Sequence, residues 1–413
     1  MQHQTSEAGK TLDPLQLFRL PWSTTDNGMS WLEVTTKCNI TCQGCYRDSR
    51  KEGHKTLEEI RTELQELRRI RKSDGLSIAG GEPLLHPELV EIVRLGRQMG
   101  WKPSINTNGQ ALTPELLAAL REAGVASFTF HIDSTQRRKE IPEGADEATF
   151  FPLRERLAGM VRDCGGVTCG MNITVSGKNV AEVPELVRWA GEHPDLCNSM
   201  HFILFRDPVM GEHLDFFAAG NKVKLDPHFS SPELATYPPL LVSDVVETIR
   251  RADPVFQPAA YLGGTHTPQA LKWLLATRFL WAGETLGYVG PRFYELAQYV
   301  AHFFTGKWLA LSPRRTFTMG FLVLFLFFPF DRGVRSAAWR FLGKVVRRPR
   351  LLLEPIYLQW FLVQQPIDFQ QDGALNMCDG CPNMTLYRGK LYWSCRLEEL
   401  KNFGVNLTAS PKA

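Results

Sequence analysis

The chain has 413 residues, a net charge of +3 and a hydrophobic content of 44%. This length exceeds one typical domain, so a catalytic domain with appended units is expected. Nine cysteines are an odd number, which argues against a fully paired disulfide framework, and the N-terminus lacks the pattern of a secretory signal. We therefore expect a cytoplasmic protein, in which clustered cysteines more often bind metal than form disulfides. Three scattered cysteines are expected in the core: Cys164, Cys169 and Cys197.

After an N-terminal extension (1–28), residues 29–206 alternate short β-rich runs with amphipathic helical stretches. The first helix starts at the capping box Thr56–Glu59. Six β-α units in a row predict an α/β fold with a partial (β/α)6 barrel, whose active site lies at the carboxyl ends of the strands. The predicted strands are Ser30–Thr35, Leu76–Ala79, Pro103–Asn106, Ser127–Ile132, Thr168–Thr174 and His201–Phe205. The later predicted helices are Pro87–Met99, Pro114–Gly124, Pro152–Val161 and Val183–Ala190.

The alternation stops at residue 207, and residues 207–368 predict a mostly helical, aromatic-rich insertion. Its segment Phe317–Phe330 is nearly free of charge, but fourteen residues fall short of the roughly 20 that span a bilayer. One interpretation is a buried helix beside a solvated basic face. The other, which we favour, is an element lying in the plane of an anionic membrane surface. The basic flanks consist of Arg314, Arg315, Arg332, Arg335, Arg340, Lys344, Arg347, Arg348 and Arg350, opposed only by Asp331.

A first group of cysteines follows the first predicted strand of the barrel. Cys38, Cys42 and Cys45 have the spacing C-x3-C-x2-C. Three thiolates on one loop can ligate three irons of a [4Fe–4S] cluster and leave the fourth iron open. Zinc sites usually need a fourth protein ligand, and none lies nearby at zinc-finger spacing.

The cysteine loop and a second motif resemble the radical S-adenosylmethionine (SAM) superfamily. Ala79-Gly80-Gly81-Glu82-Pro83, just after the second predicted strand, is similar to the GGEP motif of that family, which receives the amino group of SAM. The resemblance covers roughly Met29–Arg206 and implies that the open iron binds SAM. One departure is Gly44, because the family often has an aromatic residue before the third cysteine. Tyr46 follows that cysteine instead, so the contact to the adenine is expected to differ.

Polar residues at the other strand ends agree with the resemblance, although each is also an ordinary turn or cap residue. In the family such residues contact the ribose and carboxylate of SAM. For His131 a core role and a role near the substrate are both open. The resemblance implies the following cofactor-binding set: Tyr46, Gly80, Gly81, Glu82, Pro83, Asn108, Asp133, Ser134, Asn172 and Arg206.

A second group of cysteines lies in a small C-terminal extension (369–413). Cys378, Cys381 and Cys395 have the spacing C-x2-C-x13-C, and the run between the last two predicts a hairpin with its turn at Arg388–Lys390. The arrangement resembles the auxiliary-cluster (SPASM or twitch) extensions of radical SAM enzymes, which implies a second iron–sulfur cluster. A zinc knuckle completed by a distant ligand is the alternative. A fourth iron could be open, or closed by a residue such as Cys197 or Asp379.

The resemblance implies an enzyme that cleaves SAM to a 5′-deoxyadenosyl radical, which abstracts hydrogen from an unactivated carbon. The basic, aromatic insertion favours a membrane lipid or another long hydrophobic chain as substrate. A SPASM-type maturase of a peptide or small metabolite is the alternative, and a non-catalytic iron–sulfur electron-transfer module is a third reading. Expected partners are SAM, a reducing donor such as flavodoxin or ferredoxin, and an anionic membrane surface, with no nucleic acid. The expected location is the cytoplasm, with peripheral attachment to the inner face of the membrane.

Overall fold

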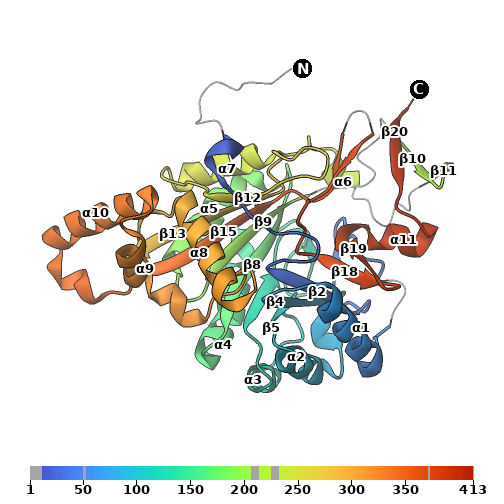
Figure 1. Ribbon diagram of the computed structural model, residues 1–413, viewed down its shortest axis with the longest axis horizontal. Helices are drawn as coiled ribbons and strands as arrows, with labels where there is room; N and C mark the ends of the chain where they lie inside the picture. The colour runs from blue at the N-terminus through green and yellow to red at the C-terminus, as the bar shows by residue number, and fades with distance from the viewer. Residues whose placement is uncertain (1–11, 50–52, 206–213, 225–231, 371–372, 413) are drawn as a thin grey trace.

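A computed structural model describes residues 12–49, 53–205, 214–224, 232–370 and 373–412 of the chain (Figure 1). Its centre is a large mixed sheet with the strand order β1-β12-β13-β15-β9-β8-β6-β5-β4-β2, in which β14 also pairs with β13. Most neighbouring strands are parallel, so the structure confirms an α/β fold whose sheet is that expected of a partial barrel.

Six consecutive parallel strands form one half of this sheet, and all six match predicted strands. Most of their residues are buried, polar ones included, because parallel strands are covered on both faces. Their bounds are β2 (Met29–Thr35), β4 (Gly75–Gly80), β5 (Lys102–Thr107), β6 (Ser127–His131), β8 (Thr168–Val175) and β9 (Ser199–Leu204).

Helices connect these strands, as the sequence predicts. At the first helix, the Thr56 hydroxyl accepts a hydrogen bond from the Glu59 N–H (3.2 Å), and the Glu59 carboxylate accepts one from the Thr56 N–H (2.7 Å). This capping box fixes where the helix begins, and Ile60, Leu64 and Leu67 then face the core. The helices are α1 (Leu57–Ile70), α2 (Leu89–Gln98), α3 (Pro114–Glu122), α4 (Phe151–Cys164) and α5 (Val183–Glu192).

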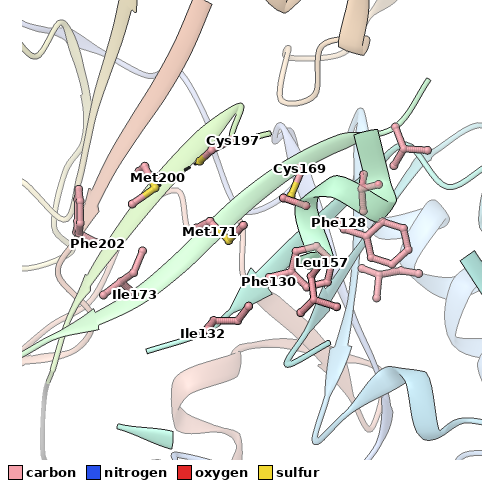
Figure 2. Packing of buried hydrophobic residues seen from close by; sticks show 14 of the residues in the cluster. Phe128, Phe130, Ile132, Leu157, Cys169, Met171, Ile173, Cys197, Met200 and Phe202 are labelled. Carbon is pink, nitrogen blue, oxygen red and sulfur yellow. Dashed lines mark hydrogen bonds between the residues drawn. The ribbon is translucent and has the colours of Figure 1, made fainter. Parts of the chain in front are cut away.

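Figure 2 shows the core between β6, β8 and β9, where aromatic and sulfur-containing side chains pack together. Cys169 and Cys197 are completely buried there, as predicted, and Cys164 is half-buried at the end of α4. The Cys197 thiol lies 3.3 Å from the Ser199 carbonyl oxygen and 3.4 Å from the Met200 sulfur. Because this thiol belongs to the main core, Cys197 is excluded as the fourth ligand of a metal centre at the C-terminal cysteines.

Apart from β1, the second half of the sheet comes from the segment predicted to be mostly helical. β15 (Tyr357–Gln364) is parallel to β9, and β13 (Trp273–Trp281) is antiparallel to β15. The prediction of a mostly helical insertion was therefore wrong in part. A fully buried apolar run such as β13 cannot be told from a buried helix by periodicity. The remaining strands of this half are β1 (Phe18–Arg19), β12 (Ala260–Leu262) and β14 (Glu284–Tyr288).

The helices of this segment lie beside the extended sheet. α7 packs against α5, and α10 packs against β14. Figure 1 shows α9 and α10 at one end of the long axis of the molecule. Among the described residues no helix is both long and apolar enough to cross a membrane. The bounds are α6 (Pro232–Ala235), α7 (Val242–Ala252), α8 (Pro291–Thr305), α9 (Gly320–Phe327) and α10 (Arg332–Arg347).

The C-terminal segment forms a hairpin and a short helix at the opposite end of the molecule (Figure 1). The turn at Arg388 and Gly389, with φ of 50° and 76°, confirms the predicted hairpin. The domain boundaries at 28, 206 and 368 stay a prediction, since β12 to β15 join the same sheet as the six parallel strands. The elements are β16 (Asp368–Phe369), β17 (Leu375–Asn376), β18 (Met384–Tyr387), β19 (Lys390–Trp393) and α11 (Leu397–Phe403). A separate small sheet contains β10 (Leu214–Ala218), β11 (Asn221–Val223) and β20 (Thr408–Pro411).

Candidate active site

The first cysteine group lies at the edge of the sheet where the parallel strands end. Its loop follows β2, and Cys42 stands in the short strand β3 (Thr41–Cys42), which pairs with β7 (Gln136–Arg137) after β6. The Gln43 N–H also donates to the Thr135 carbonyl oxygen at 2.9 Å. The loop is thus attached to the ends of two strands that are not neighbours in the sheet.

The three thiols of this loop share one environment. The Cys38 sulfur lies 4.0 Å from the Asn108 amide nitrogen. Burial, followed by the charges of Cys45, Asp133 and Cys38, raises the pKa of the Cys42 thiol well above its ordinary value. Burial also raises the pKa of Cys38 and of Cys45. Burial thus favours the neutral form of each thiol, and binding to a positively charged metal centre would favour the thiolate form.

The donor set fits an iron–sulfur cluster better than a single ion. In the described part of the chain, no three histidine, cysteine or carboxylate side chains surround one point as the ligands of a single metal ion do. A cubane cluster has a different requirement, because each thiolate binds its own iron.

The two glycines of the GGEP motif lie against the backbone that leads into the cysteine loop. A side chain on Gly80, whose φ is +143°, would come within 2.3 Å of the Thr35 carbonyl oxygen, and one on Gly81 within 2.2 Å of the Lys37 carbonyl oxygen. The Gly81 and Glu82 N–H groups donate to these two oxygens at 2.8 and 2.7 Å. Only glycine permits this approach, which joins the motif directly to the loop.

Glu82 is completely buried and already hydrogen-bonded. Its Oε1 accepts from the Thr107 hydroxyl (2.6 Å) and the Leu84 N–H (2.9 Å), and its Oε2 accepts from the Asn108 N–H (2.7 Å). Burial raises the pKa of this carboxyl, although the three hydrogen bonds oppose that shift. Glu82 therefore ties the motif to the end of β5, and its contact with the SAM ammonium stays a prediction. Pro83 opens the 3-10 turn Pro83–Leu85 that follows.

Asn108 connects β5 to the cysteine loop, and its predicted contact with SAM stays a prediction. Its amide nitrogen donates to the Asn39 side-chain oxygen at 2.8 Å. Its carbonyl oxygen accepts from Arg138 at 2.6 Å, and the Arg138 side chain is completely buried. Arg138 is a residue that the sequence analysis missed, and its positive charge acts on Cys42 and Asp133. An arginine pair directly after a strand-end motif was the available signal.

Asp133 lies at the end of β6 and holds the neighbouring strand ends together. Its Oδ2 accepts from His131 Nε2 and from the Thr174 N–H, both at 2.7 Å, and its Oδ1 accepts from the Thr135 N–H at 3.0 Å. Burial alone would raise the pKa of Asp133, but the charge and hydrogen bond of His131 lower it below its usual range. His131 is therefore an ion-pair partner of Asp133, and a SAM contact of Asp133 stays a prediction.

The remaining predicted residues are less directly connected to the loop. The Ser134 N–H donates to Glu147 at 2.9 Å, and the Asn172 side-chain oxygen is 2.8 Å from His201 Nδ1. Burial lowers the pKa of His201 to about 4, so this imidazole is neutral at pH 7 and can donate to Asn172. Arg206 lies outside the described residues. Roles of Ser134 and Asn172 in binding SAM stay predictions.

The structure gives a physical reason for glycine at position 44. Gly44 has a φ of +64°, a conformation that favours glycine, and a Cβ there would lie 2.3 Å from the Phe205 ring. An aromatic side chain is therefore excluded at this position. Tyr46 is partly exposed, with the Arg47 guanidinium 4.9 Å from its ring centroid, and its contact with the adenine stays a prediction.

We expect Gly44→Ala to prevent normal assembly of the cysteine loop. The added methyl group combines left-handed backbone strain with the overlap against Phe205, and each cysteine of the loop is then displaced. The measurement is iron bound per chain after anaerobic reconstitution, together with the thermal midpoint. Gly53→Ala is the matched control, since a Cβ on Gly53 meets no atom within 4 Å. Equal iron content in both variants would contradict the prediction.

Two cysteines of the second group, Cys378 and Cys381, lie side by side. Cys378 and Cys381 are buried and their thiols are hydrogen-bonded to each other, and the charge of Cys395 acts on Cys381. The Trp393 Nε1 donates to the Cys378 carbonyl oxygen at 3.1 Å, and Arg71 donates to the Cys381 carbonyl oxygen at 2.7 Å. Because Arg71 lies just after α1, this group is anchored on the barrel.

Arg47 joins the two cysteine groups and was also missed by the sequence analysis. Its guanidinium is 5% exposed, pairs with Glu33 on β2, and lies 3.5 Å from Glu398 on α11. Burial lowers the pKa of Arg47 to about 10, while the charges of Glu398 and Cys395 act against this shift. A charged residue two positions after the third cysteine was the sequence signal.

Comparison with known proteins agrees with this geometry. Residues 32–190 match the family described as the Radical SAM superfamily. The AdoMet-dependent heme synthase of Methanosarcina barkeri is 31% identical over 187 residues, which cover 43% of this chain and 50% of that protein. The 7,8-dihydro-6-hydroxymethylpterin dimethyltransferase of Methanocaldococcus jannaschii is 27% identical over 178 residues, which cover 41% of this chain and 35% of that protein.

Among solved structures, Streptococcus suis SuiB bound to the precursor peptide SuiA has a TM-score of 0.36 and 15% identity. That similarity covers 48% of this chain and 42% of SuiB. The chain thus spans half or less of the length of each of these three relatives.

Proposed function

We propose that this enzyme cleaves SAM reductively and uses the resulting 5′-deoxyadenosyl radical to abstract hydrogen from an unactivated carbon of a small metabolite or peptide. The observation that carries the proposal is the cysteine loop held against the GGEP backbone at the carboxyl edge of the sheet. Cys38, Cys42 and Cys45 would hold a [4Fe–4S] cluster, which supplies the electron for SAM cleavage when bound. A flavodoxin or ferredoxin is the proposed electron donor.

Side chains around the cysteine loop hold it in place, and backbone groups beside it are proposed to bind SAM. Asn108 fixes Cys38 and Asn39 relative to β5, and Glu82 fixes Asn108 relative to the GGEP motif. Backbone carbonyl groups beside Gly80 and Gly81 are proposed acceptors for the SAM ammonium. Arg138 is proposed to offset the negative charge at Cys42 and Asp133.

The C-terminal cysteines are proposed to hold a second iron–sulfur cluster. Cys378 and Cys381 lie side by side, Arg71 donates to the Cys381 carbonyl oxygen, and Arg47 pairs with Glu398 on the helix that follows Cys395. Such a cluster would bind the substrate or accept an electron as the product forms. Asp379 is not the proposed fourth ligand, because it pairs with Arg19.

The names of the relatives favour a small metabolite or peptide as the substrate over a lipid. A heme synthase and a pterin dimethyltransferase are among them, and SuiB was solved with a peptide. The lipid substrate predicted from the aromatic segment has no support from these names. We retain it as the second candidate because α9 and α10 expose an apolar surface.

The test is production of 5′-deoxyadenosine and methionine by the reconstituted, reduced protein, measured by mass spectrometry. We expect Cys42→Ala with Cys45→Ala to abolish both products, whereas Cys164→Ala, at the end of α4, should retain them. Extracts from cells that express either the intact chain or the double variant then identify the substrate class. A new polar metabolite or modified peptide supports the proposal, and a new lipid favours the second candidate. No cleavage by the iron-loaded protein would favour the electron-transfer module.

A further inference from the structure

α9 is a helix whose side chains are apolar on every face and of which only one face is covered. Gly320 and Leu324 are buried, whereas Phe321, Phe325 and Leu326 are 60%, 73% and 52% exposed. The alternative interpretation, a buried helix, therefore does not hold for α9. Large exposed apolar patches are uncommon on monomeric proteins and mark interaction surfaces.

α10 continues this surface with an outward stripe of its own. Its inner face, which includes Val334 and Phe341, is buried and packs on β14. At helical spacing on the outside, Trp339, Leu342 and Val346 are 63%, 47% and 83% exposed.

Ring contacts place the two helices side by side. The ring centroids of Phe321 in α9 and Phe341 in α10 are 6.2 Å apart, and those of Phe328 and Trp339 are 6.0 Å apart. Figure 1 shows the pair projecting from one end of the molecule. Their exposed residues therefore form one surface, which we call the apolar hairpin face: Phe321, Leu322, Phe325, Leu326, Phe330, Trp339, Leu342 and Val346.

Positive charge surrounds the apolar hairpin face. Between residues 314 and 350 there are nine arginine and lysine residues and one acidic residue, Asp331. Asp331 is buried and accepts hydrogen bonds from the Gly290, Phe293 and Val334 N–H groups, so it does not offset the surface charge. The exposed arginines that make no ion pair with a described residue are Arg315, Arg332, Arg340, Arg347 and Arg350.

The exposed apolar side chains and the surrounding positive charge together indicate what binds this surface. A second copy of the chain would bring the same cluster of positive charges against itself, which opposes association. An anionic bilayer satisfies both features, because apolar side chains enter the acyl boundary while arginines pair with headgroups. We propose that the apolar hairpin face docks the enzyme on an anionic lipid bilayer, with α9 and α10 in the plane of the interface.

The test is flotation of the full, cluster-loaded chain with vesicles of phosphatidylcholine alone or mixed with phosphatidylglycerol. We expect binding to the anionic vesicles only, weakened by salt. Arg347→Glu with Arg348→Glu should weaken it by roughly 30-fold or more, since each basic residue near the surface contributes about a factor of five. Phe325→Glu with Leu326→Glu should weaken it at least about 10-fold, because these side chains no longer enter the bilayer.

Two matched controls carry the same charge changes elsewhere. Arg68→Glu with Arg121→Glu reverses two exposed arginines on α1 and α3, and Leu15→Glu with Leu241→Glu alters leucines that are 84% and 55% exposed. Both should bind vesicles as the unaltered chain does. All four variants should keep the thermal midpoint and the rate of SAM cleavage, which separates this proposal from the proposed function. Absence of binding to anionic vesicles would overturn the proposal. A dimer that Phe325→Glu converts to monomer would overturn it in favour of a second copy.

Discussion

Replacing Arg47 by methionine should destabilise the protein by about 3–5 kcal/mol, because it leaves buried carboxylates without their counter-charge. Glu33 and Glu398 are 8% and 9% exposed, and both face the Arg47 guanidinium. Glu398 keeps Lys401 at 2.7 Å, whereas among the described residues Glu33 keeps only the Trp31 indole N–H at 3.2 Å. Since Arg47 joins β2 to α11, the loss should also release the C-terminal segment from the barrel.

The measurements are the thermal midpoint, limited proteolysis of the C-terminal segment, and iron bound per chain. Arg47→Lys should be intermediate, because lysine keeps the charge but cannot reach two carboxylates with one planar group. Arg348→Met is the control, since its pair with Glu284 is exposed and worth at most about 1 kcal/mol. If Arg47→Met were as stable as this control, Arg47 would have no role in joining the two groups.

Replacing Glu82 by alanine should cost about 3–5 kcal/mol and weaken SAM binding strongly. The Thr107 hydroxyl and the N–H groups of Leu84 and Asn108 would lose their acceptor in a fully buried place, and each unsatisfied donor costs about 1–3 kcal/mol. Water entering the space would recover part of that sum. Because Asn108 is the residue that contacts Asn39 and Cys38, its displacement should loosen the cysteine loop.

Chemical denaturation and equilibrium SAM binding to the cluster-loaded protein would measure the two effects. Glu82→Gln should be intermediate, because glutamine keeps one acceptor oxygen and places an amide group against a donor. Glu88→Ala, on an exposed carboxylate that makes no capping hydrogen bond, should change stability by less than about 0.5 kcal/mol. Normal SAM affinity in Glu82→Ala would mean that the Asn108 connection does not support the site.

The barrel half of the fold could be predicted because its signals are local. The capping box at Thr56 and the glycines at 80 and 81 each reflect nearby backbone requirements, and short β-rich runs alternating with amphipathic helices indicate the strands. The cysteine spacing likewise belongs to one loop. The hairpin at Arg388 was predicted for the same reason, since its turn requires positive φ at two adjacent residues.

The second half of the sheet and several site residues depend on distant partners and could not be predicted. Arg278 lies in the middle of β13 and is buried because Gln359 on β15 accepts its Nε–H at 2.8 Å. A charged residue in an apolar run gives no sign of such a partner. The same holds for the contact between Arg47 and Glu398, because these residues are 351 positions apart in sequence. Exposure of the aromatic residues of α9 was also not determined by composition, because an apolar helix is buried or exposed according to what covers it.

The pairing of β15 with β9 has a consequence for how the chain folds during synthesis. β9 ends at Leu204 and its partner begins at Tyr357, so roughly 150 residues are translated before the edge of β9 can be covered. At about 5–20 residues per second this interval lasts roughly 8–30 s. Throughout it the nascent barrel presents an open strand edge of apolar residues, which is a template for intermolecular pairing. Expression yield should therefore depend on chaperones that cover this edge until the late strand arrives.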